Sequence, residues 1–140
     1  MKAIDNFIAL EIIEESLKEG VSVKLTVRGN SMFPTLEEGK DVVSLVPFTQ
    51  ELSLCVGDVV LYRYRKGFIL HRVIEIPNNE IVFLKGDSLT SIEKVKRSDI
   101  LAVANYKRHS PIVLFVRRIR GILSPMLSWP NIDNEAFTRK

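Results

Sequence analysis

Hydrophobic residues along the chain follow two different periods, and the change of period separates one helix from a series of short strands. Between residues 4 and 19 the apolar positions recur every three or four residues, which predicts a helix that ends at Gly20. From Val23 to Val27 apolar and polar residues alternate, which is typical of a strand with one buried face. We therefore expect an N-terminal helix followed directly by a sheet.

Five further apolar runs predict short strands at 41–46, 59–65, 68–76, 81–85 and 100–106. Turn-forming residues at 66–67 and at 77–79 lie between neighbouring runs and favour hairpins. No repeat and no linker divides the 140 residues, so we expect a single, mainly β domain. Its predicted parts are a helix in 1–20, a β core in 21–107 and an amphipathic tail in 108–140.

The tail contains an apolar run, 112–123, into which three arginines are inserted, and Met126, Leu127 and Trp129 extend it. The run is too short and too charged to span a bilayer. Two interpretations stay open. In the first, the tail forms a short C-terminal helix, broken near Pro125, that packs on the domain or at a subunit contact. In the second, residues 112–129 form an interfacial helix that makes peripheral contact with anionic lipid head groups.

Composition and charge narrow the class of protein. The formal charge of +3 and the 46% of hydrophobic residues are ordinary for a globular protein. The basic residues do not surround a recognisable docking motif, so no nucleic-acid partner is expected. The N-terminus lacks the pattern of a secretory signal, and the expected location is the cytoplasm, with the membrane periphery as the alternative that the tail allows.

Cysteine and histidine are scarce in this chain. The single cysteine, Cys55, excludes an intrachain disulfide, and the two histidines, His71 and His109, cannot assemble a zinc site of the usual spacing. Cys55 stands in an apolar run between Leu54 and Val56, so we expect a buried structural thiol rather than a nucleophile. Neither a metal nor another cofactor is expected.

Two sequence blocks supply residue types suited to nucleophilic catalysis. Residues 29–36 (GNSMFPTL) place Ser31 among turn formers, and Pro34 disfavours a helix before it, so the serine is expected on a loop. A serine hydroxyl attacks a carbonyl only when a nearby base takes its proton. Residues 57–62 (GDVVLY), continuing to 70–74 (LHRVI), contain His71, which is a candidate for that base.

A third block, residues 84–87 (LKGD) followed by 99–102 (DILA), completes an ordered set that resembles the signal peptidase/LexA-like serine peptidase superfamily. The resemblance extends from about residue 27 to residue 104. It implies the β-fold of that superfamily, with Ser31 as nucleophile and His71 where the bacterial type I and LexA-like members carry lysine. A histidine there is the mark of the endoplasmic-reticulum and sporulation-type branch, although the membrane anchor found before the serine in many members is not seen here.

Two carboxylates compete for the third catalytic position. Asp87 belongs to the third block itself, whereas Glu93 stands about where the resemblance places the acid of the endoplasmic-reticulum enzymes. We favour Glu93 slightly, and a Ser-His dyad stays open as well. The first oxyanion donor is expected to be the backbone N–H of Ser31. Gly29 stands where many bacterial relatives have a hydroxyl residue, which leaves the second donor open.

The resemblance therefore implies a serine endopeptidase that cleaves a peptide or leader sequence bound in an extended conformation. Dedicated processing of one cytoplasmic or membrane-proximal peptide is the expected task. Two alternatives on the same fold stay open: a catalytically idle peptide-binding module, and a LexA-type regulatory domain, for which the region before Ser31 is too short to hold a DNA-binding helix-turn-helix. The sequence does not indicate an oligomeric state.

Overall fold

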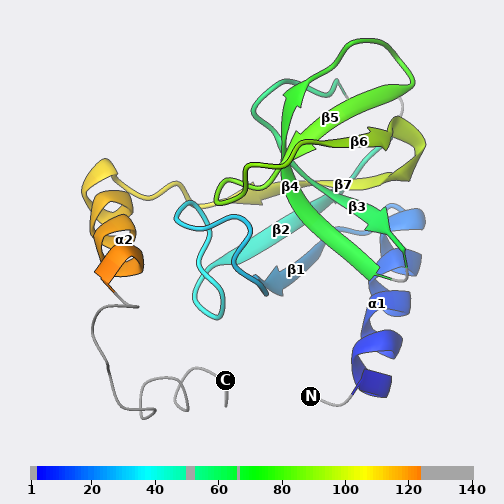
Figure 1. Cartoon of the computed structure of the whole chain (residues 1–140). Helices are drawn as coiled ribbons and strands as arrows, with labels where there is room; N and C mark the ends of the chain where they lie inside the picture. The colour runs from blue at the N-terminus through cyan, green and yellow to red at the C-terminus, as the bar shows by residue number, and fades with distance from the viewer. Residues whose placement is uncertain (1–2, 50–52, 66, 124–140) are drawn as a thin grey trace.

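A computed structural model of the chain describes residues 3–49, 53–65 and 67–123, with side chains from residue 10 onward (Figure 1). In these residues a seven-stranded antiparallel sheet is accompanied by an N-terminal and a C-terminal helix, which confirms the mainly β prediction. The elements are α1 (Ala3–Lys18), β1 (Val23–Thr26), β2 (Val42–Pro47), β3 (Val59–Tyr64), β4 (Gly67–Glu75), β5 (Ile81–Lys85), β6 (Glu93–Lys96), a 3-10 turn (Arg97–Asp99), β7 (Ile100–Tyr106) and α2 (Pro111–Leu123).

The predicted strands agree with the observed ones to within one or two residues, but β6 was not predicted. Val95 is the only apolar residue of this four-residue strand, so no alternation is visible in the sequence. The strand forms because β5 offers it a partner, with Leu84 opposite Glu93 and Val82 opposite Val95. Pairing with β5 therefore decides the conformation of this segment, because its own sequence pattern does not indicate a strand.

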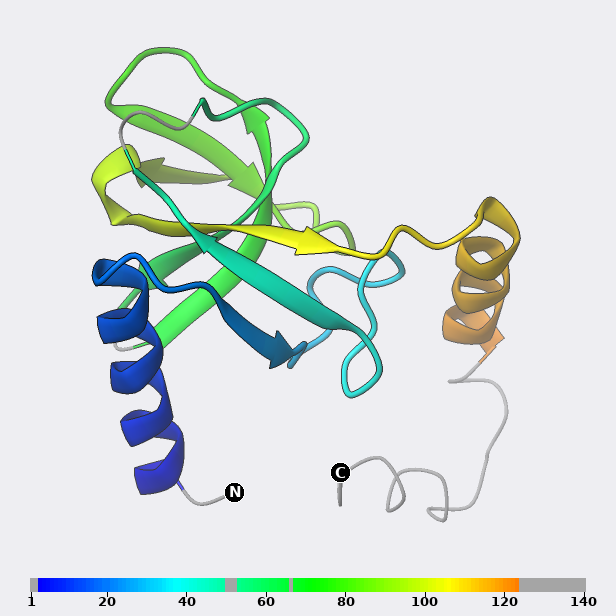
Figure 2. The ribbon, with the colours of Figure 1, turned by 180° about the vertical axis from the view of Figure 1, so that it is seen from behind.

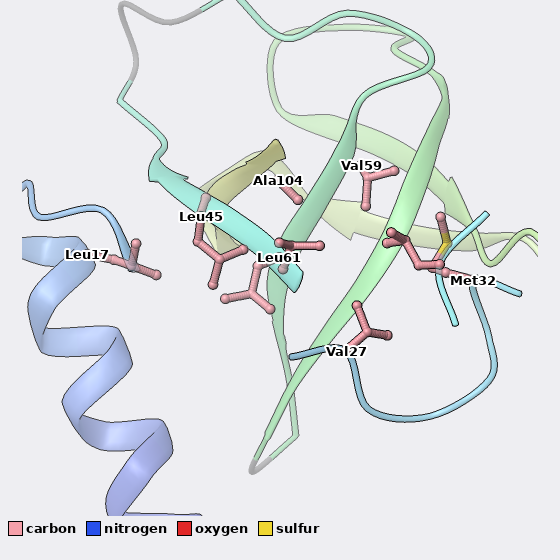
Figure 3. Packing of buried hydrophobic residues seen from close by; sticks show 10 residues of the cluster. Leu17, Val27, Met32, Leu45, Val59, Leu61 and Ala104 are labelled. Atoms are coloured by element: carbon pink, nitrogen blue, oxygen red, sulfur yellow. The ribbon is translucent and has the colours of Figure 1, made fainter. Parts of the chain in front are cut away.

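The strand order in the sheet is β1-β2-β7-β3-β4-β5-β6, and the twisted sheet has a hydrophobic cluster on each face. Neighbouring residues of β3 belong to different clusters: Val59 and Leu61 face one cluster, and Val60 and Tyr62 face the other. Figure 3 shows the first cluster, in which Leu45 of β2 and Ala104 of β7 lie on the sheet. The helix α1 adds Leu17 to this cluster, and the segment after β1 adds Val27 and Met32.

The N-terminal helix ends at Lys18, one residue before the predicted end, and Gly20 follows it in the predicted terminating role. This glycine has a φ of +84°, and the amide groups of Gly20 and Val21 donate to the carbonyls of Leu17 and Ser16. That pattern satisfies the last carbonyl groups of the helix. The buried side chain of Leu17 holds α1 on the first cluster, and an ion pair between Glu14 and Arg63 joins the helix to the end of β3. The helix is therefore fixed beside the sheet.

The C-terminal helix α2 stands apart from the sheet, on the side opposite to α1 in both views (Figures 1 and 2). It begins at Pro111, in accordance with the predicted short terminal helix. Met126, Leu127 and Trp129, which the sequence analysis assigned to the same tail, and Pro125, where the helix was expected to break, lie outside the described residues. Over the part of the chain that is described, no helix has both the length and the apolar character needed to cross a membrane.

The expectation that Cys55 is buried is wrong. Its thiol is exposed, and so is the next residue, Val56, whereas Leu54 is buried. These residues lie in the turn before β3, where the Cys55 N–H donates to the Asp58 carboxylate and the Cys55 carbonyl accepts from the Asp58 N–H. A turn of this kind directs consecutive side chains to different sides, so an apolar run of three residues does not imply that all three are buried.

Candidate active site

Ser31 lies in a series of turns between β1 and β2, outside regular structure, as the sequence predicts. The chain leaves β1, bends at Gly29 with a φ of +80°, and then turns so that the Phe33 N–H donates to the Asn30 carbonyl. The next side chain, Met32, is only 2% exposed and packs in the first hydrophobic cluster. Burial of Met32 fixes the loop against the core, while the half-buried Ser31 stays within reach of solvent.

A second loop, residues 86–89, holds the serine loop from the other side. The Ser88 N–H donates to the carbonyl of Ser31 at 3.0 Å, and the Ser88 hydroxyl donates to the carbonyl of Asn30 at 2.7 Å. In addition, the Thr35 hydroxyl donates to the Asp87 carboxylate at 2.6 Å. The position of Ser31 is therefore set by contacts with a segment more than fifty residues away in the sequence.

His71 lies on β4 and is only 3% exposed. Its Nδ1 is 3.0 Å from Oε1 of Glu93, the first residue of β6. The hydroxyl of Tyr62 on β3 lies 3.1 Å from the same nitrogen and donates a hydrogen bond of 2.9 Å to Oε2 of Glu93. Strands β3, β4 and β6 of one sheet thus bring a phenol, an imidazole and a carboxylate together, although β5 lies between β4 and β6 in the strand order.

The partners of Nδ1 define where the imidazole carries its proton. A carboxylate oxygen can only accept, and the Tyr62 hydroxyl already uses its one proton to donate to Glu93. Both atoms near Nδ1 are therefore acceptors, so Nδ1 carries the proton and donates it towards Glu93. Neutral His71 then has its lone pair on Nε2. This is the arrangement that a general base needs.

Gly86 shows that Nε2 points towards the serine loop. A Cβ atom at this buried glycine would lie 3.1 Å from Nε2 of His71 and 2.6 Å from the carbonyl oxygen of Ser31. The free nitrogen of the imidazole and the backbone of the serine therefore lie against the same small space. Only glycine leaves that space open.

The structure brings Glu93, and not Asp87, to the imidazole. Asp87 accepts two hydrogen bonds of 2.8 Å from the guanidinium of Arg72 and the one from Thr35. Burial alone would raise the pKa of the Asp87 carboxyl, but the hydrogen bonds from Arg72 and Thr35 outweigh burial, and the pKa lies below its usual value. Asp87 is an ionised anchor that joins β4 to the serine loop.

Burial and charge act in opposite directions on His71. Burial is the larger influence and lowers the pKa of the imidazole below its ordinary value, while the nearby carboxylates of Glu93 and Asp87 offset part of that effect. Burial, with the neighbouring Glu93 carboxylate, also raises the pKa of Tyr62, so its hydroxyl stays protonated. At neutral pH the site therefore contains a neutral imidazole and a neutral phenol.

Ser31, His71 and Glu93 line the same cleft, whose volume is about 680 Å³. Its other walls are largely apolar and come from α1, β1, the segment after β1, β3 and β4: Leu10, Ile13, Leu25, Val27, Met32, Leu61, Phe68 and Leu70. A slightly larger hollow of about 800 Å³ lies between Phe48, the start of β5 and the 3-10 turn, and neither a histidine nor a cysteine lines it. The chemistry of the smaller cleft makes it the candidate active site.

Tyr62 and Gly86 are the residues of this site to which the sequence analysis gave no role. The predicted hairpin around residues 66–67 contains a signal for Tyr62, because the register that pairs Val60 with His71 places Tyr62 on the same face as the histidine. No comparable signal exists for Gly86. Its importance depends on two segments that approach each other only in the folded chain.

The comparisons with protein families and curated proteins do not identify the site. Among the described residues, no group of three or more histidine, cysteine, aspartate or glutamate side chains is placed to hold a metal ion. A comparison of the chain with protein-family models gave no match, and a comparison with curated proteins gave none either.

Proposed function

We propose that this protein is a serine endopeptidase of the signal-peptidase-like type, with Ser31 as nucleophile, His71 as general base and Glu93 as the acid that orients the base. One observation carries the proposal. The Nδ1 atom of His71 is 3.0 Å from the Glu93 carboxylate, while Nε2 faces the space beside Ser31 that Gly86 leaves open. Nucleophile, base and orienting acid are the three parts of a catalytic triad, and the two neighbourhoods of the imidazole support this assignment.

In the proposed reaction, Nε2 of His71 takes the proton of the Ser31 hydroxyl as Oγ attacks the scissile carbonyl carbon. The tetrahedral oxyanion is stabilised by the backbone N–H of Ser31. Glu93 stabilises the imidazolium, which then gives its proton to the leaving amine, and the acyl-enzyme ester is hydrolysed by water through the same base. Tyr62 holds the second oxygen of Glu93 and so limits the rotation of the carboxylate.

The cleft supports a peptide as substrate. It is lined by β1 and β4, and within the described residues β1 pairs with a neighbour on one side only. An extended peptide adds to such a strand edge through backbone hydrogen bonds, and the apolar walls accept its side chains. We therefore propose an extended peptide with apolar residues near the scissile bond as the substrate.

The test is a cleavage assay on a library of extended peptides, read by mass spectrometry, with the Ser31→Ala and His71→Ala variants beside the wild type. Each variant should lose activity by about 10,000-fold or more, and the double variant should lose no more, because nucleophile and base act as a unit. Ser98→Ala, at an exposed serine of the 3-10 turn, is the matched control and should keep full activity.

If the Ser31→Ala variant cleaves peptides as fast as the wild type does, the proposed triad is refuted. A wild-type chain that binds peptides in the cleft but cleaves none of them would identify a binding module instead. Circular dichroism of each variant separates loss of chemistry from loss of fold, because removal of the Ser31 hydroxyl from a half-buried turn leaves the packing of Met32 intact.

A further inference from the structure

The orientation of α2 is the reverse of what is usual for a helix on a globular domain, which buries its apolar face. The side that meets the domain carries Arg117, only 8% exposed, whose guanidinium contacts Glu37 at 3.2 Å and Asp41 at 2.8 Å and donates to the Pro34 carbonyl. Arg120 makes a second ion pair with Glu37, of 2.8 Å. Charged contacts attach the helix to the loop that bears Ser31.

The contact is close as well as charged. A Cβ atom at Gly121 would lie 3.1 Å from the ring of Phe33, so the helix backbone rests against a side chain two residues from Ser31. Burial alone would raise the pKa of the Asp41 carboxyl, but hydrogen bonds from the Glu37 backbone, Arg117 and His109 outweigh it and lower the pKa. At neutral pH the Asp41 carboxyl is therefore ionised, and its ion pair with Arg117 is intact.

The opposite side of α2 is apolar and exposed. Its residues follow the spacing i, i+3, i+4, i+7, i+10, i+11, so they share one face of the helix. The exposed fraction reaches 75% at Ile112 and 64% at Phe115. We call this set the α2 apolar face: Ile112, Phe115, Val116, Ile119, Ile122 and Leu123. Exposed apolar surface that is contiguous in this way marks an interaction site.

The charge around the α2 apolar face selects its partner. Between residues 107 and 123 there are five lysines and arginines and no aspartate or glutamate. On a helical projection Arg118 and Arg120 border the apolar face on its two sides, and of these two Arg120 is paired with Glu37. An apolar strip with a cationic border suits an anionic lipid surface, into which the strip inserts while Arg118 meets the head groups. In a dimer through this face, the cationic borders of two chains would oppose each other.

We propose that α2 docks this protein on an anionic lipid bilayer, with the α2 apolar face inserted at the level of the head groups. The thirteen described residues extend about 20 Å, less than the 30 Å core of a bilayer, so the helix lies on the surface. Because the arginine side of α2 contacts the serine loop, docking holds Ser31 at a fixed height above the lipid. This inference concerns the surface and does not depend on the peptidase reaction.

The experiment is vesicle flotation of the full chain, with vesicles of phosphatidylcholine and phosphatidylglycerol compared with vesicles of phosphatidylcholine alone. The wild type should float with the anionic vesicles and much less with the neutral ones. The double variant Phe115→Ser/Ile119→Ser should weaken binding at least tenfold, because both side chains are exposed in the free protein and inserted in the bound one. Val21→Ser/Val56→Ser, at exposed apolar residues that neither belong to α2 nor adjoin its anchor, is the matched control and should bind as the wild type does.

The charge contribution has its own pair of variants. Arg118→Gln should weaken binding to the anionic vesicles about fivefold, and the difference should shrink at high salt. Lys96→Gln, at an exposed residue of β6, removes the same charge elsewhere and should have little effect. The proposal is overturned if the wild type floats with neither kind of vesicle. It is also overturned if the wild type binds and the α2 variants bind equally well.

Two other occupants of the α2 apolar face give distinct results. If a second copy covers the face, sedimentation equilibrium shows a dimer that Phe115→Ser/Ile119→Ser converts to a monomer, and vesicle binding is absent. If residues 124–140 cover it, the full chain does not bind vesicles, whereas Met126→Ser/Trp129→Ser in the full chain binds them. Either result refutes lipid docking by the wild-type protein.

Discussion

At His71 the two imidazole nitrogens have different neighbours, and this difference separates the roles of the nearby acids. Nδ1 faces Glu93 and Tyr62, whereas Nε2 faces the serine loop. Asp87 is close enough to favour the charged imidazole, but its oxygens are bonded to Arg72 and Thr35. Substitution of each acid should therefore have a different consequence.

Glu93→Gln should lower kcat by about 100-fold or more, because an amide does not stabilise the imidazolium that forms during proton transfer. Asp87→Asn should lower kcat by less than about tenfold but reduce the free energy of unfolding by about 1–3 kcal/mol, since it weakens a half-buried pair with Arg72. Peptide kinetics and urea unfolding on both variants measure the two effects. A larger loss of kcat in Asp87→Asn than in Glu93→Gln would reverse the assignment.

The titration of His71 provides a test that does not need turnover. Because burial outweighs the neighbouring carboxylates, its pKa should lie below 6.5, and the acidic limb of kcat/KM should follow it. Glu93→Gln removes a group that favours the imidazolium, so the pKa of His71 should fall further in that variant. Proton NMR of the imidazole across the acidic range measures both values. A pKa above 6.5 in the wild type would contradict the dominance of burial.

How much of the site the sequence predicts varies from one residue to the next. Ser31 and His71 stand in recognisable blocks, and the turn formers around Ser31 correctly predict a loop. The choice between Glu93 and Asp87 needs coordinates, because it depends on which carboxylate the β5–β6 pairing carries to the imidazole. Cys55 was misjudged because an apolar triplet in a turn does not have the single buried face that a strand provides.

At the level of elements, the site depends on the approach of the 86–89 loop to the serine loop, and Gly86 is the point of contact. Strands β3 and β4 were predictable from their apolar runs and from the turn between them. The approach of the two loops was not, because it follows from the whole strand order rather than from any local pattern.

Gly86→Ala should lower kcat/KM by about 100-fold, since its methyl group would lie 2.6 Å from a backbone oxygen of Ser31 and must displace the serine loop. Crowding of this kind should also cost about 1–3 kcal/mol of stability. Gly67→Ala is the matched control, because its methyl group would meet nothing closer than 4.0 Å. The measurements are peptide kinetics and urea unfolding. Unchanged activity in Gly86→Ala would mean that the two loops are not packed as described.

For the whole molecule, the shifted groups make the fold sensitive to acid. The native pKa values of Asp41 and Asp87 lie below 3.8, and that of His71 lies below 6.5, so at acidic pH the unfolded chain binds more protons than the native one. Stability should therefore fall as the pH decreases, first through the range of histidine and then through that of aspartate.

Urea unfolding at about pH 7 and about pH 5 tests this sign. His71 alone contributes at most about 1.4 kcal/mol per pH unit, and the slope in this range should be smaller in His71→Gln. Circular dichroism provides the signal. A wild-type stability that rises on acidification would show that the native state, rather than the unfolded chain, takes up the protons.

The division of the core between the two faces of the sheet has a consequence for how the proposed activity would be lost. Met32, beside the proposed nucleophile, packs in one cluster, whereas Tyr62, beside the proposed base, packs in the other. The alignment of Ser31 with His71 therefore depends on both clusters, which share the strands of one sheet. A shift of the serine loop against the sheet by less than about 1 Å would leave the sheet intact but misalign Oγ and Nε2. The proposed activity should therefore disappear at urea concentrations that leave the circular dichroism unchanged.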